Sequence, residues 1–410
     1  MSQPVAESRR MISLYLAAAA VFATIAARGL TVPLYAHDLG ASRFTVGALF
    51  SVATIAAALL SLPSGVLVDR FGARTLLAIS LVLTAVSQVA TALTPTVAPL
   101  FIWQIVGGLA AGIQQSAIFS AVTESVPRAR LGRAMGWLTF SMQAGFFVGP
   151  SIAGVALRWI DLRTDIAVTT LFLLLTIPGA IAASNTTQRS GAGLTLREPL
   201  RALAAQRAFI PVTVGLIAMT LTWGTIGAFL PVFGREVLQL PNSQVGYLLA
   251  LQAIVNGVSR VPAGRLVDRL HQRWPVVFAG AVGWSAVMVV LGHLSGFVGP
   301  AIVLALGTPF MAAAFVAMGV VFADLSTAST RGVTMGMYGS ILFLGLSAGP
   351  LIFGPVVQGY GYAAGFTASG LVTVLLVVVM AVLQRDQVRR RSAREPLGDS
   401  ETRSAATRQA

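Results

Sequence analysis

The chain has 410 residues, of which 56% are hydrophobic and 10% are charged, whereas soluble domains carry roughly 25% charged residues. A soluble globule of this length cannot bury so much apolar surface, because single cores stop growing at about 250–300 residues, so the sequence predicts a protein dissolved in a lipid bilayer. The lack of cysteine excludes disulfides, thiolate metal sites and cysteine nucleophiles. All 28 cationic residues are arginine and the net charge is +14. The arginines flank apolar runs, which indicates membrane surfaces rather than nucleic acid as their partner.

Residues 1–11 form a short polar start that contains Arg9 and Arg10, and an apolar run follows over 12–35. At ~1.5 Å per residue this run reaches ~36 Å, which is long enough to cross the hydrocarbon layer as a helix. A cleaved signal peptide shares the outline of a basic start and an apolar run, but the length of the run favours an uncleaved first helix.

Eleven further apolar runs follow, and each is long enough to cross a hydrocarbon layer of ~30 Å as a helix that satisfies its own backbone. They lie at 44–68, 75–93, 98–123, 134–159 and 164–183, and then at 208–233, 243–267, 274–293, 297–322, 334–357 and 362–383. The sequence therefore predicts an all-α integral membrane fold of twelve transmembrane helices, with one six-helix bundle over 12–183 and a second over 208–383.

Arginine is unevenly distributed between the two sets of loops. One set, together with both ends of the chain, carries most of the arginines, whereas the opposite loops carry only Arg43, Arg158, Arg163 and Arg235. Because arginine-rich loops stay on the cytoplasmic side, the sequence predicts a multi-pass protein of the plasma (cytoplasmic) membrane with both termini in the cytoplasm.

Two polar segments lie outside the bundles. In the linker 184–207, Leu196, Leu200 and Leu203 follow helical spacing, so the linker is either a short helix on the membrane surface or a solvated connection. The tail 384–410 is rich in Arg, Ser, Glu and Gln, which predicts a disordered basic cytoplasmic segment.

The chain repeats itself at a long and nearly constant offset. The stretch LPSGVLVDRFGAR (Leu62–Arg74) returns as VPAGRLVDRLHQR (Val261–Arg273), 199 residues later, with seven of thirteen positions identical. The stretch from Gly29 to Pro33 likewise returns from Gly227 to Pro231. A single long offset indicates that the two halves arose by internal duplication.

The stretch GVLVDRFGAR between the second and third spans resembles the cytoplasmic loop signature of the major facilitator superfamily. The matching residues of the first copy are Gly65, Asp69, Arg70, Gly72 and Arg74. The second copy keeps Gly264, Asp268, Arg269 and Arg273 but has His271 at the second glycine. The resemblance covers about residues 12–383 and implies a secondary transporter that works by alternating access.

A glycine and proline pattern in the fifth span resembles the antiporter motif that is frequent among exporters of this family. It comprises Gly145, Gly149, Pro150 and Gly154, and it recurs as Gly345, Gly349, Pro350 and Gly354. Glycines let helices approach closely and proline bends them, so the motif indicates either an exporter or tight packing with no bearing on direction. Gln104 stands where many proton-coupled exporters carry arginine, so coupling to a proton stays open.

Charged residues at the cytoplasmic ends of the spans form two equivalent clusters. The first comprises Asp69, Arg70, Arg74 and Glu124, and the second comprises Asp268, Arg269, Arg273 and Asp324. The resemblance implies that these clusters, with Gly65 and Gly264, form a gate that holds the cytoplasmic side shut. The alternative is a loop network that only fixes the topology.

Arg28 lies past the middle of the first span, where a charged side chain costs at least ~2.5–3.5 kcal/mol. Thr24, Arg28, Thr31 and Tyr35 follow an i, i+4, i+7, i+11 spacing and share one face of a helix. The resemblance implies that this face lines a central cavity, where Arg28 is a counter-charge for substrate. The alternative is a structural arginine that reaches backbone carbonyls or headgroups.

Uncharged polar and aromatic side chains within the spans are further candidates for the cavity. They are Gln104, Gln114, Gln115, Gln143, Trp223, Gln252, Asn256 and Tyr338. Each is also suited to hydrogen bonding between helices.

None of the fourteen acidic residues falls in the interior of a predicted span, since Asp165 stands at the edge of 164–183, so an anionic or neutral substrate fits better than a cationic drug. A membrane enzyme is disfavoured because no nucleophile, base or metal set lies at depth, and a sensor because the only soluble extension expected is a short tail. An ATP-driven pump is excluded because a chain without lysine has no phosphate-binding Gly-Lys-Ser/Thr loop. We expect a monomer without cofactor or metal that exports small amphiphilic compounds, with a proton as one candidate coupling ion. The alternative is an importer or facilitator of an organic anion held by Arg28.

Overall fold

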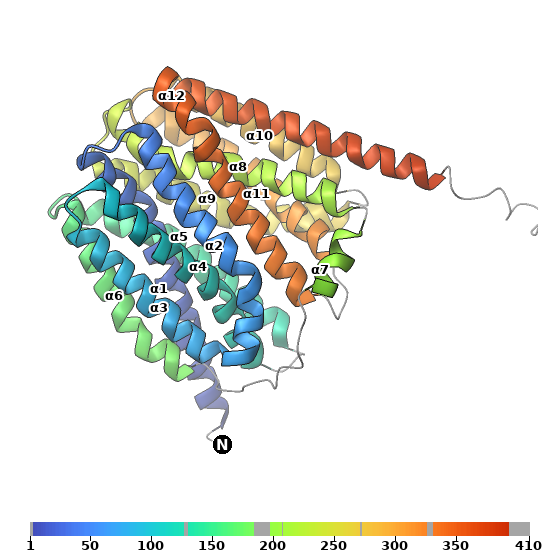
Figure 1. The fold of residues 1–410 in the computed structure, drawn as a ribbon, viewed down its shortest axis with the longest axis horizontal. Coiled ribbons are helices and arrows are strands. Elements are labelled where there is room, and N and C mark those ends of the chain that lie inside the picture. Colours follow the sequence, from blue (N-terminus) through green and yellow to red (C-terminus); the bar gives the residue numbers. More distant parts are fainter. Residues whose placement is uncertain are drawn as a thin grey trace, which may run out of the picture.

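The computed structural model describes residues 3–126, 130–183, 197–206, 208–270, 273–325 and 331–392, and these residues are almost entirely helical, without a strand. Figure 1 shows the helices lying side by side in one bundle. Their bounds are α1 (Gln3–Asp38), α2 (Arg43–Phe71), α3 (Ala73–Leu93), α4 (Val97–Glu124), α5 (Leu131–Ala156), α6 (Leu162–Ala183), α7 (Arg197–Ala204), α8 (Phe209–Glu236), α9 (Asn242–Arg269), α10 (Trp274–Leu291), α11 (Val298–Ala323) and α12 (Arg331–Ser392).

The long helix α12 contains two of the predicted spans. Its segments meet at Gly361, whose φ of 86° lies in the left-handed region that glycine adopts without a steric penalty. Within the described chain, nine segments are long and apolar enough to cross a membrane, and the longest, Gly336–Gln384, covers both parts of α12. With α7 set apart and α12 counted as two, the helices correspond to the twelve predicted spans, and the all-α membrane fold is confirmed.

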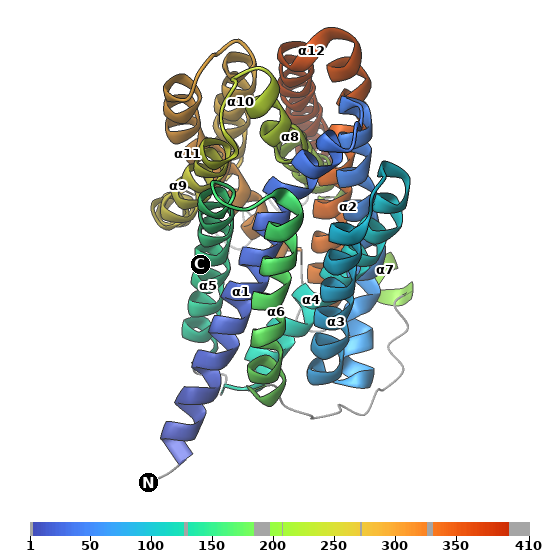
Figure 2. The ribbon, with the colours of Figure 1, turned by 90° about the vertical axis from the view of Figure 1, so that its left-hand side faces the viewer.

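Packing within the two halves repeats with the sequence. In the first half α1 packs on α5, and α4 packs on α2 and α3; in the second half α8 packs on α12, and α11 packs on α9 and α10. The halves meet along two equivalent seams, α2 with α12 and α5 with α9. Figure 2 shows α5 and α1 beside α9 and α8 in this arrangement.

The glycines of the repeated motif make these contacts close. A Cβ atom at Gly149 in α5 would overlap the carbonyl oxygen of Ala23 in α1, and one at Gly349 in α12 would overlap that of Leu221 in α8. The last glycine of each motif faces the other half instead: a Cβ atom at Gly154 would lie 3.1 Å from the Cα atom of Gly246 in α9. The motif therefore acts in packing both within and between the halves.

The buried apolar side chains form three clusters that differ in how they involve the two halves. One cluster mixes both halves and includes Leu34, Leu49, Phe229 and Phe233. The second consists of first-half residues around Leu77, Ile118 and Leu138, and the third of second-half residues around Met318 and Phe322. The shared cluster lies toward the end of the bundle where residues 38–43 connect α1 to α2, here called the distal face. The two separate clusters lie toward the opposite end, which carries residues 71–73 and is called the terminal face.

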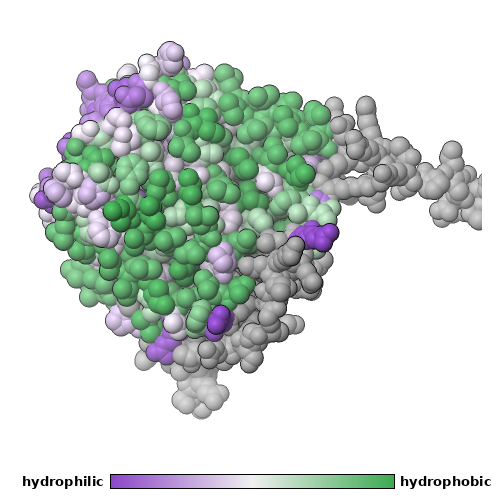
Figure 3. Space-filling view, in the orientation of Figure 1, coloured by the Kyte–Doolittle hydropathy of each residue, from purple (hydrophilic) through white to green (hydrophobic). Residues whose placement is uncertain are grey.

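The surface of the helices is apolar, as expected where lipid surrounds a protein. Leu93, Trp159, Leu175, Leu306 and Tyr360 are among its large apolar side chains with more than two thirds of their area exposed. Figure 3 shows an almost continuous hydrophobic surface over the middle of the bundle, with hydrophilic residues toward its ends. This distribution is that of a multi-pass integral membrane protein.

The ends of the chain differ from the prediction. Helix α1 begins at Gln3 within the predicted polar start, and α12 runs on to Ser392 although a disordered tail was predicted from Gln384. Figure 1 shows this last helix extending beyond the bundle. Residues 393–410 lie outside the described residues. Residues 184–196 of the linker lie outside the described residues. The part that follows contains the helix α7, which buries Leu203 against the second half, and its position on the membrane surface stays a prediction.

Candidate functional site

Arg28 is held inside the first half between α1, α3 and α4. Its Nη2 atom donates a hydrogen bond of 2.9 Å to Oε1 of Gln104 in α4. Gly107 makes room for it, since a Cβ atom there would lie 2.7 Å from Nη1, from Nη2 and from Oγ of Ser87 in α3. The structure thus brings together two predicted cavity residues, Arg28 and Gln104, through a contact between a charged group and a neutral amide.

The other polar residues of α1 are bound within the first half. The hydroxyls of Thr24 and Thr31 donate to the carbonyl oxygens of Ala20 and Ala27, one helical turn earlier. The Tyr35 hydroxyl donates a 2.6 Å bond to the carbonyl oxygen of Thr94 and accepts one from Arg163. In this conformation all three are buried, and their role toward substrate stays a prediction.

The glutamines of α4 leave hydrogen-bonding capacity unused. Gln104 and Gln114 are buried, and neither Nε2 of Gln104 nor either amide atom of Gln114 has a hydrogen-bond partner in the structure. Gln88 of α3, which sequence analysis did not single out, is in the same situation, whereas Gln115 is half-buried. Because buried polar groups normally have partners, these amides are suited to bind water or a polar ligand.

A second group of polar side chains lies on the seam between α5 and α9. Nε2 of Gln143 donates a 3.3 Å hydrogen bond to Oδ1 of Asn256, and Nε of Arg260 donates a 3.0 Å bond to the same oxygen. Gln252 lies one turn further along α9 toward the distal face and is buried. Gln143 comes from the first half and the others come from the second, so this site is completed only where the halves meet.

The guanidinium of Arg260 lies beside a group of aromatic rings. Its Cζ atom lies 5.3 Å from the ring centroid of Phe315 in α11. Trp223 of α8 and Tyr338 of α12 pack edge-on against Phe315, with centroids 5.6 and 6.3 Å away. We call this group the seam cluster, and its members are Gln143, Trp223, Asn256, Arg260, Phe315 and Tyr338.

Sequence analysis named four members of the seam cluster and missed Arg260 and Phe315. Arg260 lies inside the predicted span 243–267, next to the loop stretch Val261–Arg273, and it was not singled out. The pattern that reveals it is the spacing i, i+4, i+8 of Gln252, Asn256 and Arg260, which places all three on one face of a helix.

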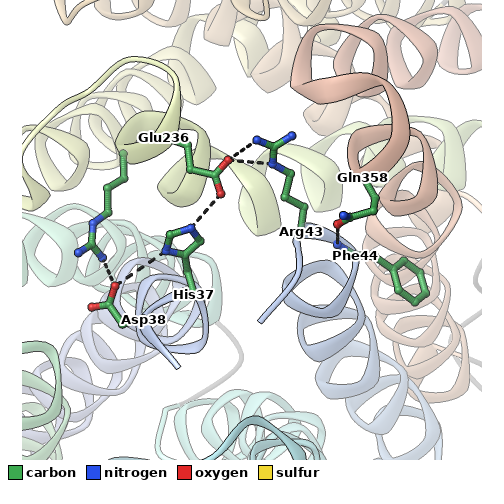
Figure 4. A network of polar contacts seen from close by, with 7 residues as sticks. His37, Asp38, Arg43, Phe44, Glu236 and Gln358 are labelled. Atoms are coloured by element: carbon green, nitrogen blue, oxygen red, sulfur yellow. Dashed lines mark hydrogen bonds and ion pairs between the residues drawn. The ribbon is translucent and has the colours of Figure 1, made fainter. Parts of the chain in front are cut away.

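A network of ion pairs joins the two halves at the distal face (Figure 4). Nη1 of Arg235 lies 2.7 Å from Oδ1 of Asp38, and Nε2 of His37 lies 2.9 Å from Oε1 of Glu236. Arg43 binds Oε2 of Glu236 through Nε at 2.8 Å and Nη2 at 2.6 Å. The backbone amide of Phe44 donates to Oε1 of Gln358, and the Arg43 guanidinium lies over the ring of Tyr362.

The network follows the duplication, although sequence analysis only placed these residues outside the spans. His37 and Asp38 end α1 as Arg235 and Glu236 end α8, at an offset of 198 residues. Each pair is a basic residue followed by an acidic one, and each basic residue contacts the acidic residue of the other pair. This reciprocal pairing is the kind that a two-fold interface produces.

The predicted cytoplasmic gate lies at the terminal face. Arg273 forms an ion pair with Asp324 inside the second half, and Arg70 lies over the ring of Phe71 at 5.3 Å. A Cβ atom at Gly65 or Gly264 would meet nothing within 4 Å, so these glycines make no close contact in this conformation. Asp268, Arg269 and Arg74 are exposed, and the side chain of Asp69 and residue His271 lie outside what the structure describes. The gate remains a prediction.

Asp165 differs from the other acidic residues. It stands at the edge of the predicted span 164–183 and lies in the first turn of α6, and it is the one carboxylate that is buried among the described residues. A negative charge in the first turn of a helix is stabilised by the helix dipole. Among the residues searched, no three His, Asp or Glu side chains come close enough together to hold a metal ion.

Sequence comparison relates the chain to membrane transporters. A family model described as the Major Facilitator Superfamily matches residues 14–307 and again residues 212–409. The Quinolone resistance protein NorA of Staphylococcus aureus is 25% identical over 122 residues, a match that spans 30% of this chain and 31% of NorA. An MFS-type transporter of Methanocaldococcus jannaschii is 20% identical over 371 residues, which cover 87% of this chain and 94% of that protein.

Solved structures of transporters share the fold. The nucleoside transporter NupG superposes with a TM-score of 0.75 at 14% identity, covering 91% of this chain and 98% of NupG. The human organic anion transporter MFSD10 gives 0.65 at 16% identity, covering 91% and 99%. A bacterial homologue of the human lysosomal transporter Spinster, in an inward-facing and unoccupied conformation, gives 0.74 at 14% identity, covering 92% and 96%. At these identities the likeness extends to the fold alone.

Proposed function

Because the chain belongs to the Major Facilitator Superfamily, we propose that it exports small amphiphilic molecules from the cytoplasm by alternating access. The observation that carries this proposal is the seam cluster. There, amide groups from both halves, one guanidinium and three aromatic rings lie next to one another where the halves meet. A ligand held between two halves that rock against each other is exposed first to one side and then to the other.

The chemistry of the seam cluster suits a molecule with one apolar and one polar end. Trp223, Phe315 and Tyr338 offer broad ring surfaces, which bind apolar bodies well because they present large areas at little cost in conformational entropy. Gln143 and Asn256 offer the hydrogen-bonding groups that fix a polar end.

The arrangement of the buried clusters supports access from the terminal face. The halves share one apolar cluster at the distal face and are cross-linked there by ion pairs, whereas each has its own cluster toward the terminal face. The positive-inside rule assigns the arginine-rich terminal face to the cytoplasm. A transporter in this conformation loads its substrate from the cytoplasm, as an exporter must.

A second candidate function is the transport of a small organic anion with Arg28 as counter-charge. The observation that favours it is the hydrogen bond of Arg28 to a neutral amide, since none of the described acidic residues forms an ion pair with it. A buried guanidinium next to an amide leaves its charge uncompensated, and an anion that binds and leaves would compensate it.

Flux measurements test the proposed function. The purified protein is reconstituted into proteoliposomes with an imposed proton gradient, and fluorescent amphiphiles that are acidic, basic or neutral are supplied on one side. We expect accumulation of neutral or acidic amphiphiles and its reduction by Gln143→Ala. Thr139→Ala is the matched control, since Thr139 is an exposed residue one turn earlier in α5. Wild-type vesicles that accumulate none of these compounds beyond protein-free vesicles would rule the function out.

A further inference from the structure

We propose that Arg260 forms an anion site of its own in the second half, which binds the carboxylate or sulfonate of an aromatic organic anion whose ring lies against Phe315, Trp223 and Tyr338. The site is separate from Arg28, which lies inside the first half against α3 and α4. The inference rests on the proposed function and specifies which substrates the seam cluster prefers.

The side chain of Arg260 points into the bundle rather than toward the nearer membrane surface. Arg260 precedes the terminal-face end of α9 at Arg269 by nine residues, or about 14 Å at ~1.5 Å per residue. Its Nε atom donates to Asn256, which lies one turn further from that face. An arginine that reached for headgroups would extend the other way, so the guanidinium stays at depth, where an isolated charge is unfavourable.

The packing of the fold does not require this cation. At the offset of 199 residues, Arg260 corresponds to Ser61 and Asn256 corresponds to Ala57, both of which are buried in α2. Ser61 lies against Gly339 of α12, so the equivalent seam closes with small side chains. A charge that only one of two equivalent seams carries points to a role in binding rather than in packing.

The guanidinium of Arg260 is positioned to receive an anion. Its Nε atom is already engaged by Asn256, and the side chain lies beside the ring of Phe315. None of the described acidic residues forms an ion pair with it. The planar fork of guanidinium nitrogens matches the two oxygens of a carboxylate or sulfonate, and the neighbouring rings add a surface for an aromatic body.

Binding of two matched probes to the purified full chain tests the proposal. 1-Naphthoate and 1-naphthalenemethanol share the same ring system and differ in charge, and calorimetry gives both dissociation constants. We expect the wild type to bind naphthoate about tenfold more tightly, as a charge-assisted hydrogen bond provides. Arg260→Ser, which introduces the residue of the equivalent seam, should reduce this preference to about twofold or less. Arg260→Lys should retain part of it, because lysine keeps the charge but not the fork.

The control variant is Arg265→Ser, which removes an exposed arginine from the same helix and should leave the preference unchanged. Arg260→Gln replaces Arg260→Ser if the serine variant does not fold. A preference that survives in both Arg260 variants, or that is lost only in Arg28→Gln, would overturn the proposal. Flux of the neutral probe distinguishes the export function from the anion site at Arg260. If vesicles with Arg260→Ser still transport the neutral probe, the export function stands even where transport of naphthoate is lost.

Discussion

At the residue scale, Arg28 occupies a space that glycine leaves open. A Cβ atom at Gly107 would lie 2.7 Å from both Nη atoms of Arg28 and from Oγ of Ser87. We therefore expect Gly107→Ala to displace the guanidinium from Gln104 and to lower the free energy of unfolding by about 1–3 kcal/mol, as overpacking does. Thermal unfolding in detergent measures the effect. Gly29→Ala is the control, because a Cβ atom there meets nothing within 4 Å, and equal stability of the two variants would contradict the prediction.

Arg28 itself distinguishes the two candidate functions. If Arg28 binds an anionic substrate, Arg28→Ala should weaken its affinity by about 1.5–3 kcal/mol, the value of a charge-assisted hydrogen bond. Arg28→Lys should recover part of this loss, and affinity for a neutral compound should change little. Competition binding at matched expression measures these affinities. Unchanged transport of an anion by Arg28→Ala would make Arg28 a structural residue.

The sequence predicted which single residues carry unusual chemistry better than it predicted their partners. Arg28 and Gln104 were both candidates, yet nothing in either helix specifies that their side chains meet, because the rotation of α1 against α4 is set by packing of the whole half. Arg260 was missed for a different reason. It lies near the end of the predicted span 243–267, where the spacing from Gln252 and Asn256 places it on their helix face, and the contact with Asn256 shows that its side chain points away from the membrane boundary.

At the scale of elements, the glycine motif occurs once in each half, so we expect a substitution in either copy to destabilise the protein. Gly149→Ala and Gly349→Ala each place a methyl group into a carbonyl oxygen of the helix opposite, α1 or α8. Both should lower the free energy of unfolding by about 1–3 kcal/mol, because packed helices separate only at the cost of their contacts. Gly136→Ala in α5 is the control, since a Cβ atom there has open space. Thermal unfolding that spared either motif variant would show that the contacts of α5 with α1 and of α12 with α8 are not equivalent.

Helices were predicted more reliably in number than in length. Apolar runs locate the spans because a helix in lipid must be apolar over its length, but helices α1 and α12 continue beyond the predicted apolar runs into mostly polar sequence. The spacing of apolar residues therefore does not predict how far α1 and α12 extend beyond their spans. The break between the last two spans was predicted as a gap between 357 and 362, and in the structure it is a kink at the single residue Gly361.

At the scale of the whole molecule, the long offset in the sequence predicted two similar halves but not which end of the bundle they close. Which face is closed depends on the contacts between the two halves, and these contacts change during the transport cycle. The residues that hold the distal face closed in this structure lie at the ends of α1 and α8. The sequence placed them outside the spans but did not identify their partners. Their offset of 198 residues and their matching order of charge were available in the sequence, and the reciprocal pairing becomes predictable only once a two-fold relation between halves is assumed.

The ion pairs at the distal face should set the balance between conformations. Glu236 accepts from Arg43 and His37, and it is mostly buried, with 19% of its side chain exposed. Exposed pairs contribute about 0.2–1 kcal/mol each, so Glu236→Gln should favour opening of the distal face by about 1 kcal/mol, roughly fivefold in population. Because the chain has no cysteine, spin labels at Thr96→Cys and Ser295→Cys, exposed positions of equivalent distal loops, report the distance between halves without background.

We expect Glu236→Gln to increase the long-distance fraction between these labels. Asp161→Asn is the control, since this exposed carboxylate accepts hydrogen bonds from Thr164 of its own half. Exchange of charge in the second pair, Asp38→Arg with Arg235→Asp, should restore the closure that either change alone weakens, because the pair of opposite charges is rebuilt across the same interface. High salt should also increase the long-distance fraction, because it screens these ion pairs. Unchanged distances in Glu236→Gln and in both single variants of the second pair would show that apolar packing between α1, α2, α8 and α12 closes the distal face without help from charge.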